Sequence, residues 1–229
     1  MRRLAVGRSR QYVVPGEVGM EPQVVWRSAR AVVLDKPAGW LSVPSSRGVA
    51  EPRPVLGIWA QEQLGRVWPV HRLDEPVSGL VLMALDAELH RAACGWFDGH
   101  AVVKTYAAWS EVHAAPPVGE ETWTGRLLEG KKRSYADPRG REVVTEVLAE
   151  AREGAWLRWR LRPRTGRRHQ LRVELARRGF PLAGDVLYGA AAWDRPGIGL
   201  RAVALDLPAA AAAFGLPGRI EVASASLIR

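Results

Sequence analysis

Two short segments carry the side chains that could do chemistry. The first is HRLDEPVSGLVLMA, which runs from His71 to Ala84 and places Asp74 in a charged turn directly before an apolar run. A carboxylate that is held where a loop meets a rigid strand can act as a nucleophile or a base. Arg72, in the same turn, could bind a phosphate or a base. A structural role remains open, because Asp74 could also tie down its own loop through a local hydrogen bond.

The second segment, RTGRRHQLRVELA, runs from Arg164 to Ala176. A Thr-Gly turn precedes a helix that is predicted from about Arg168 to Arg178 and that the following glycine and proline would end. Its first turns would hold basic side chains, to which the positive end of the helix dipole would add. These are Arg167, Arg168, His169 and Arg172, while Leu171 and Leu175 would form the buried stripe. The alternative is a solvated basic helix with a structural histidine.

The charge of the chain points to a polyanionic partner. The formal net charge is +9, from 33 Lys and Arg against 24 Asp and Glu. Between Arg158 and Arg178, nine Arg stand against one acidic residue, Glu174, which is a local excess of eight charges in 21 residues. Such an excess favours RNA, DNA or an anionic membrane surface, although a solvated arginine-rich surface would have the same composition.

The stretch from Ala155 to Arg162 is predicted to be the second strand of a hairpin whose first strand spans 143–152. Its side chains alternate between apolar residues and arginines, so the strand should have two unlike faces. One face would hold Leu157, Trp159 and Leu161, and the other Arg158, Arg160 and Arg162. An all-arginine face of this kind can line a groove for a phosphate backbone.

The remaining periodicity predicts an α+β chain with a mixed sheet. A helix at 55–64 would turn Val55, Ile58 and Trp59 inward, and a second helix would follow Asp86 as its N-cap. Residues 119–141 are interpreted as a turn-rich, charged connection. The further strands are expected at 24–26, 31–35, 78–85, 102–109, 200–207 and 219–223.

Composition narrows the class of protein. A single cysteine, Cys94, excludes an internal disulfide framework and a Cys-rich zinc site, so a reducing cytoplasm is the simplest compartment. The longest apolar runs are too short to span a bilayer, and the five histidines show no metal-ligand spacing. We therefore expect no metal site and no membrane partner, and a monomer is the default.

Five stretches together resemble the RluA-type RNA pseudouridine synthases. HRLDEPVSG (71–79) is similar to the HRLDxxTSG signature of that family, and RTGRRHQLRVELARRGFPLAGDVLYG (164–189) is similar to its GRTHQIRVHLA…G.PI.GD..YG segment. LDKPAGWLSVP (34–44) resembles the early DKPAGLxVHP stretch, VVKTYAAW (102–109) the K-x-Y strand, and GREVVTEV (140–147) the segment before the basic strand. The resemblance runs from about residue 24 to 208 in the order of the family.

This resemblance implies the pseudouridine synthase fold, an α+β domain with a large, mixed, mostly antiparallel sheet, flanking helices and a central basic cleft. Residues 1–24 would form a basic N-terminal extension and 25–229 the catalytic domain. The implied reaction is the isomerisation of uridine to pseudouridine in structured RNA, either ribosomal RNA or tRNA. Because this reaction has no redox change and no net gain or loss of atoms, no cofactor is expected.

The resemblance also implies roles for matched residues. Asp74 would be the catalytic aspartate, and Arg172 would pair with it and keep it ionised. Tyr106 would pack against the target base, and Leu171 would form an apolar wall of the same pocket. Arg72 would help to extrude the target nucleotide or fill the space that it leaves. Further candidates for RNA binding are His71, Arg160, Arg162, Arg167 and His169.

The chain departs from the family pattern at Val77, Arg168, Glu174 and Arg201, where Thr, Thr or Ser, His and His are usual. These positions suggest a divergent member, and they leave the proposed catalytic residues untouched. The alternative function is a catalytically idle RNA-binding or ribosome-assembly module on the same fold. A generic DNA-binding protein would leave the five stretches unexplained and shows no helix-turn-helix or zinc-finger pattern.

Overall fold

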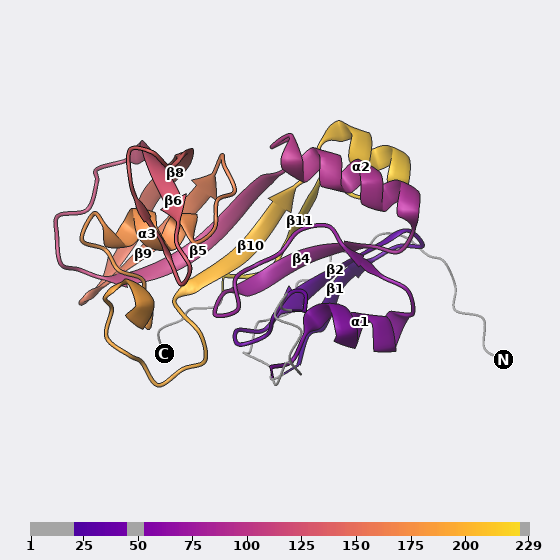
Figure 1. The fold of residues 1–229 in the computed structure, drawn as a ribbon, viewed down its shortest axis with the longest axis horizontal. Helices are drawn as coiled ribbons and strands as arrows, with labels where there is room; N and C mark the ends of the chain where they lie inside the picture. Colours follow the sequence, from indigo (N-terminus) through magenta and orange to yellow (C-terminus); the bar gives the residue numbers. More distant parts are fainter. Residues whose placement is uncertain (1–20, 45–52, 225–229) are drawn as a thin grey trace.

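The computed structural model describes residues 21–44 and 53–224, and within them eleven strands form one sheet (Figure 1). The strands are β1 (Gln23–Arg27), β2 (Ala31–Lys36), β3 (Trp68–Pro69), β4 (Ser78–Ala84), β5 (Val103–Glu111), β6 (Glu120–Glu129), β7 (Ser134–Ala136), β8 (Arg141–Glu153), β9 (Trp156–Pro163), β10 (Leu200–Asp206) and β11 (Arg219–Glu221). The α-helices are α1 (Leu56–Leu64), α2 (Ala87–Asp98) and α3 (Gln170–Ala176), and the 3₁₀ helices are η1 (Val186–Tyr188) and η2 (Ala209–Phe214).

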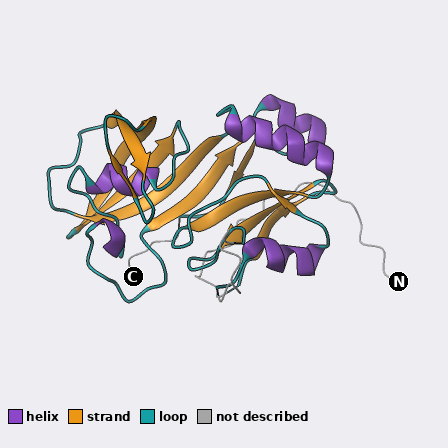
Figure 2. Ribbon diagram, in the orientation of Figure 1, coloured by secondary structure: helices purple, strands orange, loops and turns teal. Residues whose placement is uncertain are grey.

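The sheet follows the order β1-β2-β4-β10-β5-β9-β8-β6-β7, with β3 paired to β4 and β11 to β10. Within the described ranges, β10 and β4 run parallel and the other pairs run antiparallel. Figure 2 shows how few helices accompany this long sheet. The predicted α+β class with a mixed, mostly antiparallel sheet is therefore confirmed.

Helices cover both faces of the first half of the sheet, with α1 below and α2 above β2 and β4 in Figure 1. Val81 and Met83 of β4 share one apolar cluster with Leu56 of α1, and Leu80 shares the other with Leu89 of α2. Each fully buried side chain of this size stabilises the fold by about 1.5–3 kcal/mol. Burial on both faces explains why β4 is a continuous apolar run rather than an alternating one.

The parallel contact between β4 and β10 depends on Gly79. Its φ of +115° is unfavourable for other residues, and a Cβ there would lie 2.2 Å from the carbonyl oxygen of Ala202. Any side chain would therefore push β10 away from β4. Because the two strands are parallel, their N-terminal ends lie side by side. The loop before β4 and Leu200 at the start of β10 therefore meet at the same end of the strands, where the pocket lies.

Most predicted elements are present, and three expectations were wrong. Residues 119–141 contain β6 and β7 rather than only turns, and Ile58 is 49% exposed because α1 buries Leu56 and Ala60 instead. The helix predicted from Arg168 starts only at Gln170, since His169 before it has the left-handed φ of 57°.

Other local predictions hold. Asp86 caps α2 by accepting hydrogen bonds from the backbone N–H groups of Glu88 and Leu89, at 3.0 and 2.9 Å. The hairpin of β8 and β9 is formed as expected. Most of the predicted N-terminal extension lies outside the described residues. None of the helices in the described ranges is long and apolar enough to cross a membrane.

Candidate active site

A cavity of about 340 Å³ opens between the loop before β4, strand β5 and the segment that leads into α3. This volume lies within the range of cavities that hold small ligands, about 300–1,000 Å³. Its wall includes the predicted catalytic residues Asp74, Tyr106 and Arg172, together with Leu171 and His169. Residues from three separate stretches of the sequence, around 74, 106 and 169–172, thus lie in one pocket.

The loop that carries Asp74 is fixed by a buried lysine. The Nζ atom of Lys36 donates hydrogen bonds to the carbonyl oxygens of Pro37, Trp40 and Glu75, at 3.0, 2.8 and 3.2 Å. Burial lowers the pKa of Lys36 to about 7, and the negative charges of nearby carboxylates, Glu75 first, oppose this shift. Because Glu75 follows Asp74 directly, this lysine holds the backbone next to the carboxylate.

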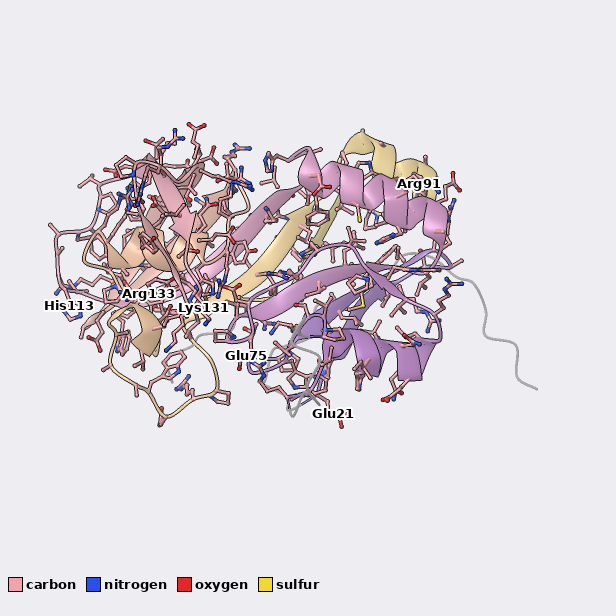
Figure 3. The ribbon with its side chains drawn as sticks, in the orientation of Figure 1. Glu21, Glu75, Arg91, His113, Lys131 and Arg133 are labelled. Carbon is pink, nitrogen blue, oxygen red and sulfur yellow. The ribbon has the colours of Figure 1, made fainter. Side chains whose placement is uncertain are left out.

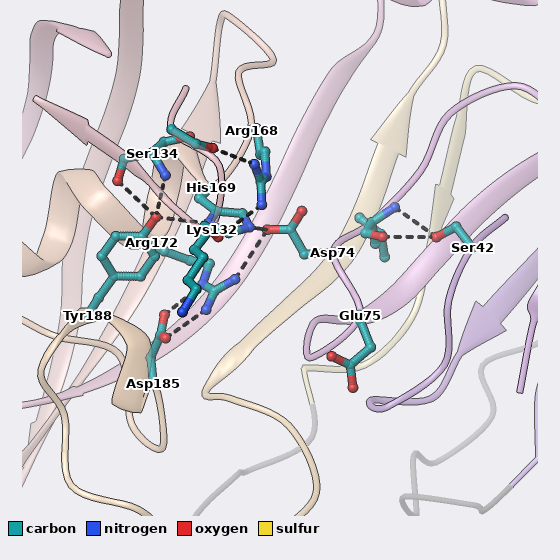
Figure 4. Close-up of polar contacts among 12 residues, drawn as sticks. Ser42, Asp74, Glu75, Lys132, Ser134, Arg168, His169, Arg172, Asp185 and Tyr188 are labelled. Carbon is teal, nitrogen blue, oxygen red and sulfur yellow. Dashed lines mark hydrogen bonds and ion pairs between the residues drawn. The ribbon is translucent and has the colours of Figure 1, made fainter. Parts of the chain in front are cut away.

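A serine of the same stretch holds the other side of the loop. Ser42 Oγ donates to the carbonyl oxygen of Leu73 and accepts from its N–H, both at 3.0 Å (Figure 4). The N–H of Gly39 donates to the carbonyl of Glu75 at 2.9 Å. The residues before and after Asp74 are thus both anchored to the 36–42 segment, so the carboxylate sits on a rigid support.

Arg172 lies beside Asp74, but its closest partner is Asp185. Its Nε and Nη2 atoms donate to the two carboxylate oxygens of Asp185, each at 2.7 Å, whereas its Nη1 lies 3.6 Å from Asp74 Oδ2. Burial alone would lower the pKa of Arg172, but the Asp185 carboxylate outweighs burial and raises it. The sequence had not predicted a role for Asp185, which orients the arginine toward Asp74 (Figure 4).

His169 also approaches Asp74, with Nε2 at 3.7 Å from Oδ2. Its Nδ1 lies 2.8 Å from the hydroxyl of Tyr188, which donates to the carbonyl of Ser134 at 3.0 Å and accepts from the Ser134 N–H at 3.1 Å. Because that hydroxyl has one proton, Nδ1 must be the donor in neutral His169, which leaves Nε2 as a proton acceptor. Burial lowers the pKa of His169, while the Asp74 charge opposes this shift.

Tyr106 and Leu171 form the apolar part of the pocket. Leu171 is buried on α3, and Tyr106 packs against the same cluster from β5. Burial, and after it the negative charge of Asp74, raises the pKa of the Tyr106 hydroxyl above its ordinary value. The ring is therefore neutral and offers a flat apolar surface beside the carboxylate.

His71 and Arg72 line the pocket in different ways. The ring of His71 stacks on Phe97, with centroids 4.3 Å apart, and its Nε2 accepts a hydrogen bond from the N–H of Leu82 at 3.0 Å. Burial, with the nearby charge of Lys104, lowers the pKa of His71 to about 3. His71 is thus a neutral packing group here, whereas the side chain of Arg72 is exposed at the rim.

The arginines of β9 lie on the other face of the sheet. Tyr106 pairs directly with Leu161, so these two side chains point to the pocket face, and Arg160 and Arg162 point away from it. Arg160 also lies 3.5 Å from Glu150, which partly neutralises it. Arg167, by contrast, lines the pocket, as does Lys104, which the sequence analysis did not single out.

Two departures from the family pattern have a local structural reason. Arg168 donates to the carbonyl oxygens of Gly130 and Lys132, at 3.0 and 2.9 Å, and so fixes the turn between β6 and β7. Glu174 is fully buried and forms ion pairs of 2.8 Å with both Arg177 and Arg178. These contacts brace α3 without touching the pocket.

The two other positions that depart from the family pattern also have a structural role. Val77 is buried in the core, and Arg201 forms an ion pair with Asp35 on β2.

Within residues 21–44 and 53–224, no group of three or more His, Cys, Asp or Glu side chains is placed to hold a metal ion.

Comparison with known proteins places this chain in a class of RNA-modifying enzymes. The family described as RNA pseudouridylate synthase matches residues 30–177, so this chain belongs to that family, as a member of the RluA type. The enzymes of this family isomerise uridine in RNA.

The individual relatives share about a quarter to a third of their residues with this chain. An uncharacterized RNA pseudouridine synthase of Zymomonas mobilis is 35% identical over 178 residues, which cover 73% of this chain and 78% of that protein. The tRNA pseudouridine synthase C of Pectobacterium carotovorum is 30% identical over 181 residues, covering 73% of this chain but only 48% of that relative. The structure of human RNA Pseudouridylate Synthase Domain Containing 1 has a TM-score of 0.69 at 23% identity, covers 86% of this chain and 82% of its own, and shares the fold.

Proposed function

We propose that this protein converts uridine to pseudouridine in structured RNA, with Asp74 as the catalytic carboxylate. The observation that carries this proposal is the placement of Asp74, which is partly exposed in a pocket between Tyr106, Leu171 and Arg172. A uracil ring would lie against Tyr106 and Leu171 once it leaves its stack. The carboxylate would then face the bond that has to break.

The chemistry needs only groups that this pocket contains. The bond between C1′ of the ribose and N1 of uracil breaks, a bond from C1′ to C5 forms, C5 loses its proton and N1 gains one. Asp74 would act as a nucleophile at the ribose or at the uracil ring, and both routes conserve every atom. Arg172 would hold the carboxylate in its charged form, and Asp185 would keep Arg172 in position.

His169 is the best candidate for moving the C5 proton. Its Nε2 atom is an acceptor that faces Asp74, and Tyr188 fixes the ring from the other nitrogen. The left-handed backbone of His169 is unusual for a residue that is not glycine, and such strain is concentrated at functional sites. We therefore assign His169 a proton-transfer role rather than only RNA contact.

The RNA substrate is proposed from chemistry and from a relative. The Pectobacterium protein is named a tRNA pseudouridine synthase, which makes a uridine in tRNA the first substrate to test. Ribosomal RNA is the second pool, because the same pocket would accept an extruded uridine from either.

The proposal is tested with RNA from cells that lack this protein. Purified wild-type protein is incubated separately with the tRNA and the ribosomal RNA fraction, and nucleosides are then separated and quantified. We expect new pseudouridine at defined sites in one fraction. If RNA binds tightly but neither fraction gains pseudouridine, the enzyme assignment is wrong and the chain is a binding module.

A further inference from the structure

We propose that Lys104 and Arg167 form a second subsite of the same pocket, which binds a phosphodiester group of the RNA next to the target nucleotide. This inference rests on the proposed function, because it takes RNA as the ligand. Neither residue touches the carboxylate of Asp74 in any hydrogen bond or ion pair of the described chain.

Lys104 is a partly buried cation that no hydrogen bond or ion pair of the described residues neutralises. Its side chain lines the pocket from β5, and burial lowers its pKa. Among the described residues, no hydrogen-bond acceptor or carboxylate pairs with its ammonium group, although Asp98 also lines the cavity. A desolvated charge without a partner costs free energy, so its retention in a pocket indicates a ligand that supplies the partner.

Arg167 is a second cation of this pocket, and one atom of its guanidinium lacks a hydrogen-bond partner among the described residues. Its Nε atom is buried without a hydrogen-bond partner within the described part of the chain, and the side chain lines the cavity. Its backbone is fixed, because its N–H donates to the side-chain oxygen of Gln170 at 3.1 Å. Gly166, the residue before Arg167, lies close to Lys104, because a Cβ at Gly166 would be 3.6 Å from the Lys104 ammonium, and both cations line the same cavity.

The spacing along β5 suits a nucleotide. Lys104 and Tyr106 lie on the same face of the strand and are two residues apart, which corresponds to about 7 Å. If the uracil packs on Tyr106, the sugar spans the space between the two residues and a phosphate reaches Lys104. Ammonium and guanidinium groups are the usual protein partners of phosphate oxygens.

The contrast with Arg172 supports a role in ligand binding. Arg172 is also a cation of this pocket, but Asp185 neutralises it through two hydrogen bonds of 2.7 Å. A pocket that needed its cations only for folding would pair all of them in this way. Lys104 and Arg167 are instead left for a charge that arrives with the substrate.

The test is the salt dependence of binding to unfractionated tRNA, measured for the wild type, Lys104→Met, Lys104→Arg and the double variant Lys104→Met with Arg167→Met. Each lost phosphate contact should reduce the slope of log affinity against log salt by about 0.7. We therefore expect a reduction of about 0.7 for Lys104→Met, about 1.4 for the double variant, and none for Lys104→Arg. Arg91→Met removes an equal charge from an exposed position of α2 that does not line the pocket (Figure 3), and should keep the wild-type slope.

Thermal unfolding separates this role from a structural one. Lys104→Met removes an unpaired desolvated charge, so its melting temperature should equal or exceed that of the wild type while its RNA affinity falls. A folded Lys104→Met protein with the wild-type slope would overturn the subsite. Weaker binding with an unchanged slope would also overturn it, because Lys104 would then contact a base or sugar. These measurements need no turnover, so they remain decisive even if no pseudouridine is formed.

Discussion

The two faces of the central sheet carry cations of different kinds. The face of β9 that points away from the pocket holds a run of arginines, and two of them, Arg158 and Arg160, lie within 3.5 Å of Glu150. The pocket is also lined by cations, of which Arg172 pairs with Asp185 and Lys104 has no hydrogen bond or ion pair within the described residues. The density of basic residues in the sequence therefore indicates a polyanion-binding protein, whereas only the structure shows which cations line the pocket.

Breaking the buried pair of the pocket should have the largest effect on stability. In Asp185→Asn the buried Arg172 guanidinium loses its closest counter-charge and both of its 2.7 Å charged contacts, so we expect the free energy of unfolding to fall by about 3 kcal/mol. Asp206→Asn is the matched control, because it breaks the surface ion pair with Arg219 and should cost about 1 kcal/mol or less.

Urea unfolding of both variants measures the difference. Equal losses of stability would mean that Arg172 finds another partner, with Asp74 at 3.6 Å as the nearest carboxylate, and that Asp185 does not orient it. Activity should fall together with stability in Asp185→Asn and should stay near that of the wild type in Asp206→Asn.

The second prediction concerns His71 and pH. The folded-state pKa of His71 is about 3 against 6.5 for the free side chain, so below pH 6.5 the unfolded chain binds a proton that the folded chain does not. Stability should therefore fall as pH drops from 6.5 toward 3, by about 2 kcal/mol at pH 5 from this group. Urea unfolding at pH 7.5 and pH 5 should show a smaller pH dependence in His71→Gln.

The same pH experiment also tests the charge of Lys104, because that charge helps to lower the pKa of His71. Lys104→Met should recover a part of the stability that the wild type loses between pH 7.5 and pH 5. An identical pH dependence in the wild type and His71→Gln would show that the histidine is protonated in the folded state, in conflict with the hydrogen bond that it accepts from Leu82.

The smallest effect is expected from the arginine face of β9. Arg160→Ala combined with Arg162→Ala should weaken RNA binding and flatten its salt dependence, but by less than the loss of Lys104 and Arg167. The pairing of Arg160 with Glu150 and the position of both arginines away from the pocket are the physical reasons. A larger change of slope in this variant would move the main path of the RNA to that face.

Much of the pocket could be predicted from sequence because its residues lie in contiguous motifs. Asp74, Tyr106, Leu171 and Arg172 come together as the resemblance implied. The strand β6 was missed because it lies near the end of the sheet and buries only Trp123 and Leu127, which leaves a polar pattern that looks like turns.

The supporting residues could not be assigned roles from one sequence. Lys36, Lys104, Asp185 and Tyr188 all stand in stretches that resemble the family, yet their functions depend on contacts with distant segments. The burial of Lys36 under the Asp74 loop and the bond from Tyr188 to His169 arise only when the chain folds. Likewise, alternation along β9 predicted two faces but could not say which of them meets the pocket.

The most direct test of the account is tritium release from RNA that is labelled at C5 of uracil, because C5 must lose its proton in this isomerisation. The wild type, Asp74→Asn and Glu75→Gln would be compared on the RNA fraction that yields product; the Glu75 carboxylate is adjacent but points away from that of Asp74 (Figure 4). We predict release by the wild type and by Glu75→Gln, and background release by Asp74→Asn with nearly unchanged RNA affinity. Release by Asp74→Asn at the wild-type rate would contradict the assignment of Asp74 as the catalytic carboxylate.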